Sequence, residues 1–193
     1  MPIIDIKLIT GYSADARRRL SERITDATTS VIDAPADLVT VTINEINPDN
    51  YMRGRTGRQP GPAIPDQTRI VTDYLQAMEA RDLERAKAMQ AEGFTMKFPG
   101  NAEFKSIDEL LQWASQRYSS VAKKIVRFDE CITQVSSVVY CHGTLYGTWL
   151  DGTAFEGVRF IDRFELQDNL IVEQLVWNDL AEVRANISVQ SDS

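Results

Sequence analysis

The sequence has little of what metal and disulfide chemistry requires. Its 193 residues include a single histidine and only two cysteines, Cys131 and Cys141. One histidine excludes a histidine-rich metal centre, and the two cysteines do not follow the paired spacing of a zinc site. Two cysteines in a cytosolic chain are more often reduced and packed than joined. We therefore expect no metal and two packed thiols.

The sequence also lacks a long apolar run. No segment approaches the ~20 apolar residues that cross a bilayer, and the first twenty residues do not have the pattern of a secretory signal. With 43% hydrophobic and 25% charged residues, the composition is typical of packed domains. These features predict a soluble, cytoplasmic protein without a membrane partner.

Charged and aromatic residues are distributed unevenly along the chain, which indicates two parts. Residues 1–64 carry eight acidic and eight basic side chains, so the formal charge of −7 resides in 65–193, which also holds all three tryptophans. An acidic surface repels phosphate, which disfavours nucleic acid as a partner. Prolines and glycines in 56–65 obstruct helix and strand. We place a linker there, domains at 1–55 and 66–184, and a fraying polar tail at 185–193.

The first domain has the pattern of a strand, a helix and a second strand. Ile4, Ile6 and Leu8 alternate with polar residues, which predicts a strand with one apolar face. Ser13 is suited to cap a helix that ends near Asp33-Ala34-Pro35. The apolar stripe expected on this helix is Leu20, Ile24, Ala27 and Val31.

The second strand of this domain is predicted from Leu38 to Ile46, with Val39, Val41 and Ile43 facing inward. A helix between two strands is most simply a right-handed crossover between parallel neighbours. A unit of about 60 residues with few aromatics buries little apolar surface. We therefore expect a homo-oligomer.

From Pro2 to about Arg55 the chain resembles the 4-oxalocrotonate tautomerase group, whose short βαβ subunits begin with proline and form symmetric oligomers. The matching features are Met1-Pro2, the Gly11 turn, Asp33-Ala34-Pro35, the strand from Val39 to Glu45 and the loop from Asn50 to Gly54. The resemblance implies a hexamer, with a dimer as the fallback.

The resemblance also implies that Pro2 is catalytic. Removal of Met1 would turn the proline nitrogen into a secondary amine, and chain-end amines titrate near ~8 in water. A partly apolar pocket with nearby cations disfavours the protonated amine, so it can act as a general base near neutral pH without a cofactor. The alternative is that a proline after methionine merely ends an edge strand.

The chain departs from this family at two positions. Many members have arginines after the first-turn glycine and in the second strand, where this chain has Tyr12 and Thr40. Neither replacement offers the bidentate charged fork that binds a carboxylate. Arg53 and Arg55, in the loop with Tyr51 that the family uses to cover the site, are the expected replacements. The alternative is that they are solvated loop arginines.

The second domain is predicted to be α+β, because helical patterns precede strand patterns. Apolar residues at helical spacing fall around Tyr74 and Ala86, and Ser106 with Glu109 forms a capping box. Helices are therefore expected to pack on one face of a curved antiparallel sheet. The predicted strands are Lys124–Val135, Val138–Leu150, Ala154–Leu166 and Leu170–Asn178.

This order resembles the nuclear transport factor 2 or SnoaL-like superfamily, a cone-shaped α+β barrel that includes ketosteroid isomerase. The matching stretches are 74–82, 94–100 and 157–164. Tyr74 falls where the isomerases keep an oxyanion-binding tyrosine, but Phe98 falls where they have a base aspartate. The isomerase mechanism therefore does not transfer.

The sequence still predicts a cavity in this domain. One face of the strand from Ala154 is expected to carry Glu156, Val158, Phe160, Asp162 and Phe164. A buried acid near His142 would be a functional candidate, because burial and pairing shift pKa values. Tyr74, Phe98, His142 and Asp162 are the candidate pocket residues, with a structural histidine as the alternative.

The sequence thus predicts a cofactor-independent tautomerase or isomerase. Its general base would be Pro2, acting on a small keto, enol or unsaturated acid that is anionic if Arg53 binds it. A first alternative is a ligand-binding or assembly protein that keeps both folds without chemistry. A second is water addition or dehalogenation at the same proline.

Overall fold

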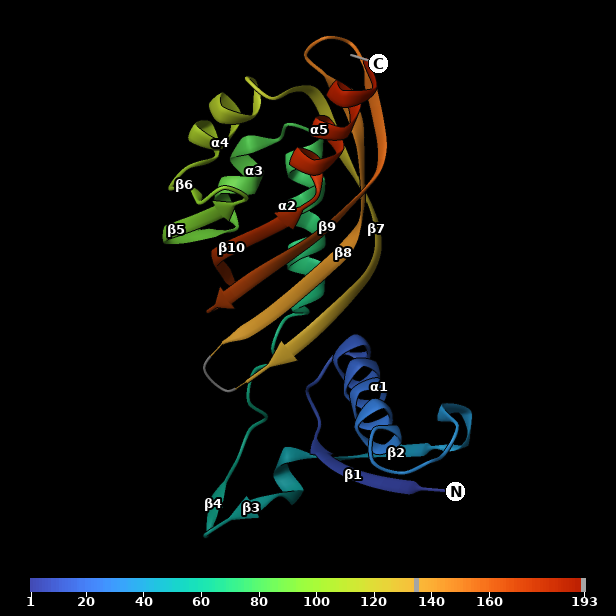
Figure 1. Cartoon of the computed structure of the whole chain (residues 1–193). Coiled ribbons are helices and arrows are strands. Elements are labelled where there is room, and N and C mark those ends of the chain that lie inside the picture. The colour runs from blue at the N-terminus through green and yellow to red at the C-terminus, as the bar shows by residue number, and fades with distance from the viewer. Residues whose placement is uncertain (134–135, 192–193) are drawn as a thin grey trace. The chain divides into compact units, whose positions relative to one another are not determined.

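The computed structural model describes residues 1–133 and 136–191, with the side chains of the last helix described as far as Ala185 (Figure 1). The chain divides into two compact units, Met1–Ile64 and Pro65–Ser193. None of the helices in the described ranges is both long and apolar enough to span a membrane.

The first unit is a βαβ arrangement. Strand β1 (Ile3–Ile9) pairs in parallel with β2 (Thr40–Ile46), and helix α1 (Ala14–Thr29) connects them. Short 3₁₀ helices η1 (Ala36–Leu38) and η2 (Pro48–Asn50) flank β2. A small hairpin of β3 (Met52–Arg53) and β4 (Thr56–Gly57) follows. The predicted linker therefore begins with a strand.

The apolar faces of this unit are only partly covered. Ile4, Ile6 and Leu8 are half-buried while Ile3, Asp5 and Lys7 are exposed, which confirms the predicted alternation. Ser13 caps α1 by accepting from the amide of Ala16 at 3.1 Å. None of residues 1–64, all of which the structure describes, is fully buried.

Helix α1 ends earlier than predicted, and its apolar stripe is shorter. The helix stops at Thr29, and Val31 lies beyond it with 84% of its surface exposed. Ala27 is exposed as well. Thr28, Thr29 and Ser30 donate their hydroxyls to carbonyls of the preceding turn. Serine and threonine are weaker helix formers than alanine or leucine, and a run of them favours a helix end in this segment.

The second unit is a curved six-stranded sheet with helices on one face (Figure 1). Its helices are α2 (Gln67–Glu79), α3 (Leu83–Ala88), α4 (Ile107–Ala114) and α5 (Leu180–Ser191). The strand order is β6-β5-β10-β9-β8-β7. The strands are β5 (Gln90–Phe98), β6 (Ala102–Phe104), β7 (Tyr118–Ile132), β8 (Ser137–Trp149), β9 (Ala154–Gln167) and β10 (Leu170–Asn178).

Several predicted boundaries of this unit change. The α+β architecture is confirmed, but the sheet has free edges at β6 and β7 and is not a closed barrel. Strands β5 and β6 were not predicted, and β5 pairs in parallel with β10. Strand β7 begins at Tyr118 instead of Lys124. Its predicted end at Val135 lies outside the described residues.

The predicted tail is also corrected, because α5 continues to Ser191. The amide of Leu180 is held by the Asn178 side chain at 3.2 Å, and Leu180 is buried. An anchored first turn followed by alanine, glutamate and arginine favours a helix where a polar composition alone predicted fraying.

A β-bulge changes which side chains face inward at the start of β9. Gly157 has a φ of +70°, and the pairing of β8 with β9 shifts between Leu145 and Gly147. An extra residue in a strand exchanges its two faces. Phe155 is therefore buried and Glu156 exposed, whereas Val158, Phe160, Asp162 and Phe164 face inward as predicted.

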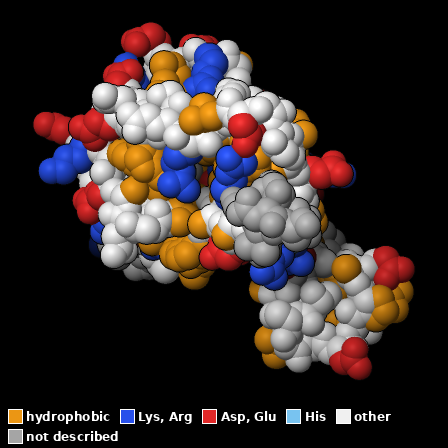
Figure 2. Space-filling view, turned by 45° about the horizontal axis from the view of Figure 1, so that its top comes forward, with side chains coloured by type: hydrophobic (Ala, Val, Ile, Leu, Met, Phe, Trp, Pro, Cys, Tyr) orange, Lys and Arg blue, Asp and Glu red, His pale blue; other side chains and the backbone are white. Residues whose placement is uncertain are grey.

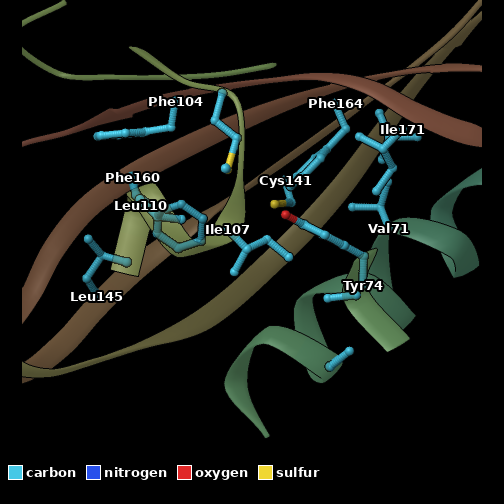
Figure 3. Packing of buried hydrophobic residues seen from close by; sticks show 14 of the residues in the cluster. Val71, Tyr74, Phe104, Ile107, Leu110, Cys141, Leu145, Phe160, Phe164 and Ile171 are labelled. Atoms are coloured by element: carbon cyan, nitrogen blue, oxygen red, sulfur yellow. The ribbon is translucent and has the colours of Figure 1, made fainter. Parts of the chain in front are cut away.

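The core lies between the helices and the sheet (Figure 3). The Tyr74 ring of α2 packs edge-on against Phe94 and Phe164, with centroids 6.4 and 5.9 Å away. Cys141 lies in this core and Cys131 is exposed, so packed thiols were wrongly predicted for Cys131. Burial, with the nearby Asp162 carboxylate, raises the pKa of Cys141 to about 12.

Candidate functional sites

Pro2 lies at the start of β1 and is half-buried. Its carbonyl accepts a hydrogen bond from the amide of Thr40 at 3.0 Å. Thr40 is exposed at the start of β2, opposite Ile3 in the parallel register. The structure therefore brings Pro2 and Thr40 together at one end of the two-stranded sheet.

The other predicted substrate-binding residues lie at the opposite end of this sheet. Tyr12 follows the end of β1, and the β3–β4 hairpin follows the end of β2 (Figure 1). Seven residues of parallel strand separate the two ends by roughly 23 Å. Tyr12 and Tyr51 are half-buried, and Arg53 and Arg55 are exposed. Within one chain these residues do not meet Pro2.

Arg17 is a neighbour of Tyr12 that was not among the predicted site residues. Its guanidinium donates to the Tyr12 carbonyl at 2.5 Å and to Glu45 of β2 at 3.1 Å. These contacts tie α1 to the turn after β1 and to the second strand. The predicted Ser13 cap could have indicated these contacts, because it places Arg17 one turn into the helix, near the ends of the two strands.

The second unit contains a cavity of about 380 Å³ between its helices and the sheet. Of the four candidate pocket residues, Tyr74, Phe98 and Asp162 line it and His142 does not. Phe98 packs edge-on against Phe104 and Trp113, with centroids 5.7 and 5.6 Å away. Phe98, at the position where the isomerases have a base aspartate, is thus one of the aromatic side chains in the cavity wall.

Asp162 is the polar centre of this cavity. It is fully buried on β9, and its Oδ2 accepts from Lys123 Nζ of β7 and from Gln174 Nε2 of β10, the latter at 3.2 Å. Its Oδ1 has no hydrogen-bond partner among the described residues. Neither partner was predicted, although Lys123 stands between Val121 and Ile125 on an otherwise apolar face of β7.

His142 lies on the other face of the sheet. On β8 it is Cys141 that stands opposite the buried Asp162, and His142 stands opposite Ile161, which is 39% exposed. Neighbouring residues of a strand point to opposite faces. The structure therefore does not bring His142 and Asp162 together as an acid–base pair.

Tyr74 is held in the core by its neighbours. Its hydroxyl oxygen accepts from Gln90 Nε2 at 3.2 Å. Burial of the ring raises the pKa of Tyr74 to about 12, an effect that the Gln90 hydrogen bond opposes and the Asp162 charge increases. The phenol is therefore protonated at neutral pH and can donate a hydrogen bond.

On the visible face of the larger, second unit in Figure 2, hydrophobic and basic side chains lie near the centre and acidic side chains lie mainly toward the rim. In residues 1–133 and 136–191, no three histidine, cysteine, aspartate or glutamate side chains are grouped as a metal site.

Comparison with known proteins assigns both units. Residues 2–57 match the family model described as tautomerase enzyme, and residues 71–174 match the model of the SnoaL-like domain. A curated protein of Halalkalibacterium halodurans, named a probable tautomerase, is 35% identical over 51 residues. These residues are 26% of this chain and 84% of that protein.

Solved structures resemble the second unit in fold. An NTF2-like protein of unknown function from Burkholderia pseudomallei is 17% identical with a TM-score of 0.52, over 62% of this chain and 95% of that chain. TerC, co-crystallised with polyporic acid, is 13% identical with a TM-score of 0.51 over the same shares. The chain thus belongs to the tautomerase family through its first unit and to the SnoaL-like domain family through its second.

Proposed function

We propose that the chain is a cofactor-independent tautomerase whose general base is the nitrogen of Pro2. The observation that carries this proposal is the family match, which begins at Pro2 itself, the residue that opens β1 beside Thr40. After Met1 is removed, that nitrogen is a secondary amine at a half-buried position.

The proposed reaction needs only this amine. The nitrogen takes a proton from the carbon next to the substrate carbonyl, and the C–H electron pair becomes a carbon–carbon double bond while the carbonyl oxygen takes up negative charge. The ammonium then returns the proton to that oxygen or to another carbon. A positioned base of this kind contributes typically 10²–10⁴-fold to rate.

Substrate binding is proposed to involve a second subunit. Because Tyr12, Tyr51, Arg53 and Arg55 lie at the far end of the sheet from Pro2, one subunit would supply them to the Pro2 of another. The half-buried apolar faces of the first unit are consistent with such an assembly. We propose a homo-oligomer, with a hexamer favoured over a dimer.

Blocking the Pro2 nitrogen tests the base. The processed protein is expected to ketonise an enolised aryl pyruvate, followed by ultraviolet absorbance. The same chain with an uncleaved N-terminal extension is expected to lose about 10²-fold or more, because an amide nitrogen cannot take a proton. A matched chain with the extension at its C-terminus should keep its rate.

Mass spectrometry must first show that the processed protein starts at Pro2. Equal rates with a free and a blocked nitrogen would refute the proline mechanism. Absence of turnover in both forms, across enol, keto and halogenated unsaturated acids, would favour a protein that keeps the fold for binding or assembly.

Arg53→Ala tests whether Arg53 supplies the positive charge that binds the substrate carboxylate. A charged hydrogen bond to a substrate carboxylate is worth ~1.5–3 kcal/mol, so kcat/KM for an anionic substrate should fall about ten- to a hundredfold. For a neutral carbonyl compound it should change little.

Arg58→Ala, an exposed arginine outside the hairpin, is the matched control and should leave both substrates unaffected. Equal losses on both substrates would identify Arg53 as structural. If neither substrate is affected by Arg53→Ala, the charge lies elsewhere, and Arg55→Ala is the next variant.

A further inference from the structure

Strand β7 lies at one edge of the six-stranded sheet and leaves one side of its backbone unpaired. It is 15 residues long, and among the described residues it pairs only with β8 (Figure 1). Strands are usually about 5–6 residues long, and a long free edge offers amide and carbonyl groups to another strand. Lysines and bulges normally limit such pairing. β7 contains both, and they restrict which strand can pair with it.

The two halves of β7 carry opposite charges. Lys123 and Lys124 precede its centre, and Asp129 and Glu130 follow it. Lys124 is exposed, and Asp129 is 47% exposed, with its Oδ1 2.6 Å from Arg127 Nη2. Opposite charges that face each other across two strands are stabilising, and like charges are destabilising. A second copy of β7 therefore matches the first in charge when it runs antiparallel, because its acidic half then lies beside the basic half.

A bulge in β7 fixes the register of this pairing. The pairing of β7 with β8 shifts between Ile125 and Arg127, which leaves one extra residue in β7. An extra residue exchanges the two faces of a strand. Ile125 and Phe128 therefore both line the inner cavity, whereas Lys124 and Asp129 both lie on the outer face. Two antiparallel copies match inner face to inner face when Ile125 of one lies opposite Phe128 of the other, which also places Lys124 opposite Asp129.

We propose that β7 pairs antiparallel with β7 of a second copy, with Lys124 of each opposite Asp129 of the other, so that two six-stranded sheets join at their edges. A twofold axis makes this contact twice. A slip of two residues keeps the faces matched but places Lys124 opposite Arg127 in one direction, which is repulsive, and opposite the uncharged Cys131 in the other. The interface lies in the second unit and uses none of the residues proposed for the Pro2 site.

Zero-length crosslinking of the full chain tests the contact. A carbodiimide joins an amine to a carboxylate only where the two touch. Within one chain Lys124 and Asp129 are five strand residues apart, roughly 16 Å, so a crosslink between them has to join two copies. When ¹⁴N and ¹⁵N protein are mixed at low concentration and then concentrated, mass spectrometry should find Lys124 peptides of one isotope joined to Asp129 peptides of the other.

The chain supplies its own positive control for this reaction. Lys87 and Asp108 lie 3.3 Å apart within one chain, and both are partly exposed, so their crosslink should form without mixing the isotopes. If the Lys87–Asp108 crosslink forms and the mixed-isotope Lys124–Asp129 crosslink does not, the proposal is wrong. A mixed-isotope crosslink from Lys124 to another carboxylate in its place would overturn the register.

Two complementary charge reversals test the energetics. Lys124→Glu alone and Asp129→Lys alone each replace both opposite-charge contacts by like-charge contacts, so the dissociation constant of this pairing, from analytical ultracentrifugation, should rise about tenfold. An equal mixture of the two variants restores both contacts and should return to the wild-type value. Lys105→Glu, an exposed lysine outside β7, is the control for net charge and should have no effect.

The outcome does not depend on the proposed function. The chain with a blocked Pro2 nitrogen should give the same Lys124–Asp129 crosslink, even though its tautomerase activity is lost. Single variants that associate as tightly as the wild type, or a mixture that associates no more tightly than either variant alone, would refute the pairing of β7 with β7.

Discussion

Gly143→Ala is expected to destabilise the second unit by at least about 3 kcal/mol, at the upper end of the usual cost of overpacking. A methyl group at this position would stand 2.0 Å from the Lys124 carbonyl oxygen and 3.1 Å from the Ile125 Cα. Both atoms belong to the backbone of β7, which pairs with β8 over most of its length. Neither can move away without disturbing that pairing.

Chemical unfolding followed by tryptophan fluorescence measures this effect, since all three tryptophans lie in the second unit. Gly61→Ala is the matched control, because no atom lies within 4 Å of its added methyl and its φ is not positive. An unchanged midpoint for Gly143→Ala would mean that β7 and β8 are not paired in this register.

The two units are expected to differ in whether they fold when each is expressed separately. The buried core lies entirely within the second unit, so residues 65–193 should unfold cooperatively alone. The first unit has no fully buried residue. Units this small bury a smaller fraction of their chain surface than larger domains do, and are correspondingly marginal in stability. Residues 1–64 at low concentration should therefore show no cooperative transition.

Circular dichroism over a range of concentrations tests this expectation. Structure in residues 1–64 that appears only as concentration rises, with a matching increase in mass by light scattering, is the expected result of assembly. A concentration-independent, folded monomer of residues 1–64 would contradict both the burial argument and the proposed oligomer.

The first unit could be predicted well because its pattern is local. The alternation in β1 and the Ser13 cap depend on neighbours in sequence, and both are confirmed. The end of α1 could not be predicted from apolar spacing, because Val31 continues the spacing beyond Thr28, Thr29 and Ser30, whose hydroxyls bond to backbone carbonyls and compete with helical bonding. That competition depends on backbone geometry, which a hydrophobic pattern does not contain.

The second unit shows where local patterns fail. Strand β5 follows directly after α3 and pairs with β10, which is about 80 residues further along the chain. No turn signal separates β5 from the preceding helix, so it was missed. The placement of Glu156 also failed, because the Gly157 bulge changes the face without changing the composition of the strand.

The sequence alone determined both families, the order of helices and strands in the βαβ unit and the inward face of β9 beyond its bulge. These follow from local spacing and from motifs that a chain carries wherever it folds. Only the tertiary structure decided that Asp162 meets Lys123 and Gln174, that His142 faces the other way, and that Pro2 and Arg53 lie at opposite ends of the two-stranded sheet. The physical reason is that strand register and direction set which side chains meet, and pairing between distant segments sets the register.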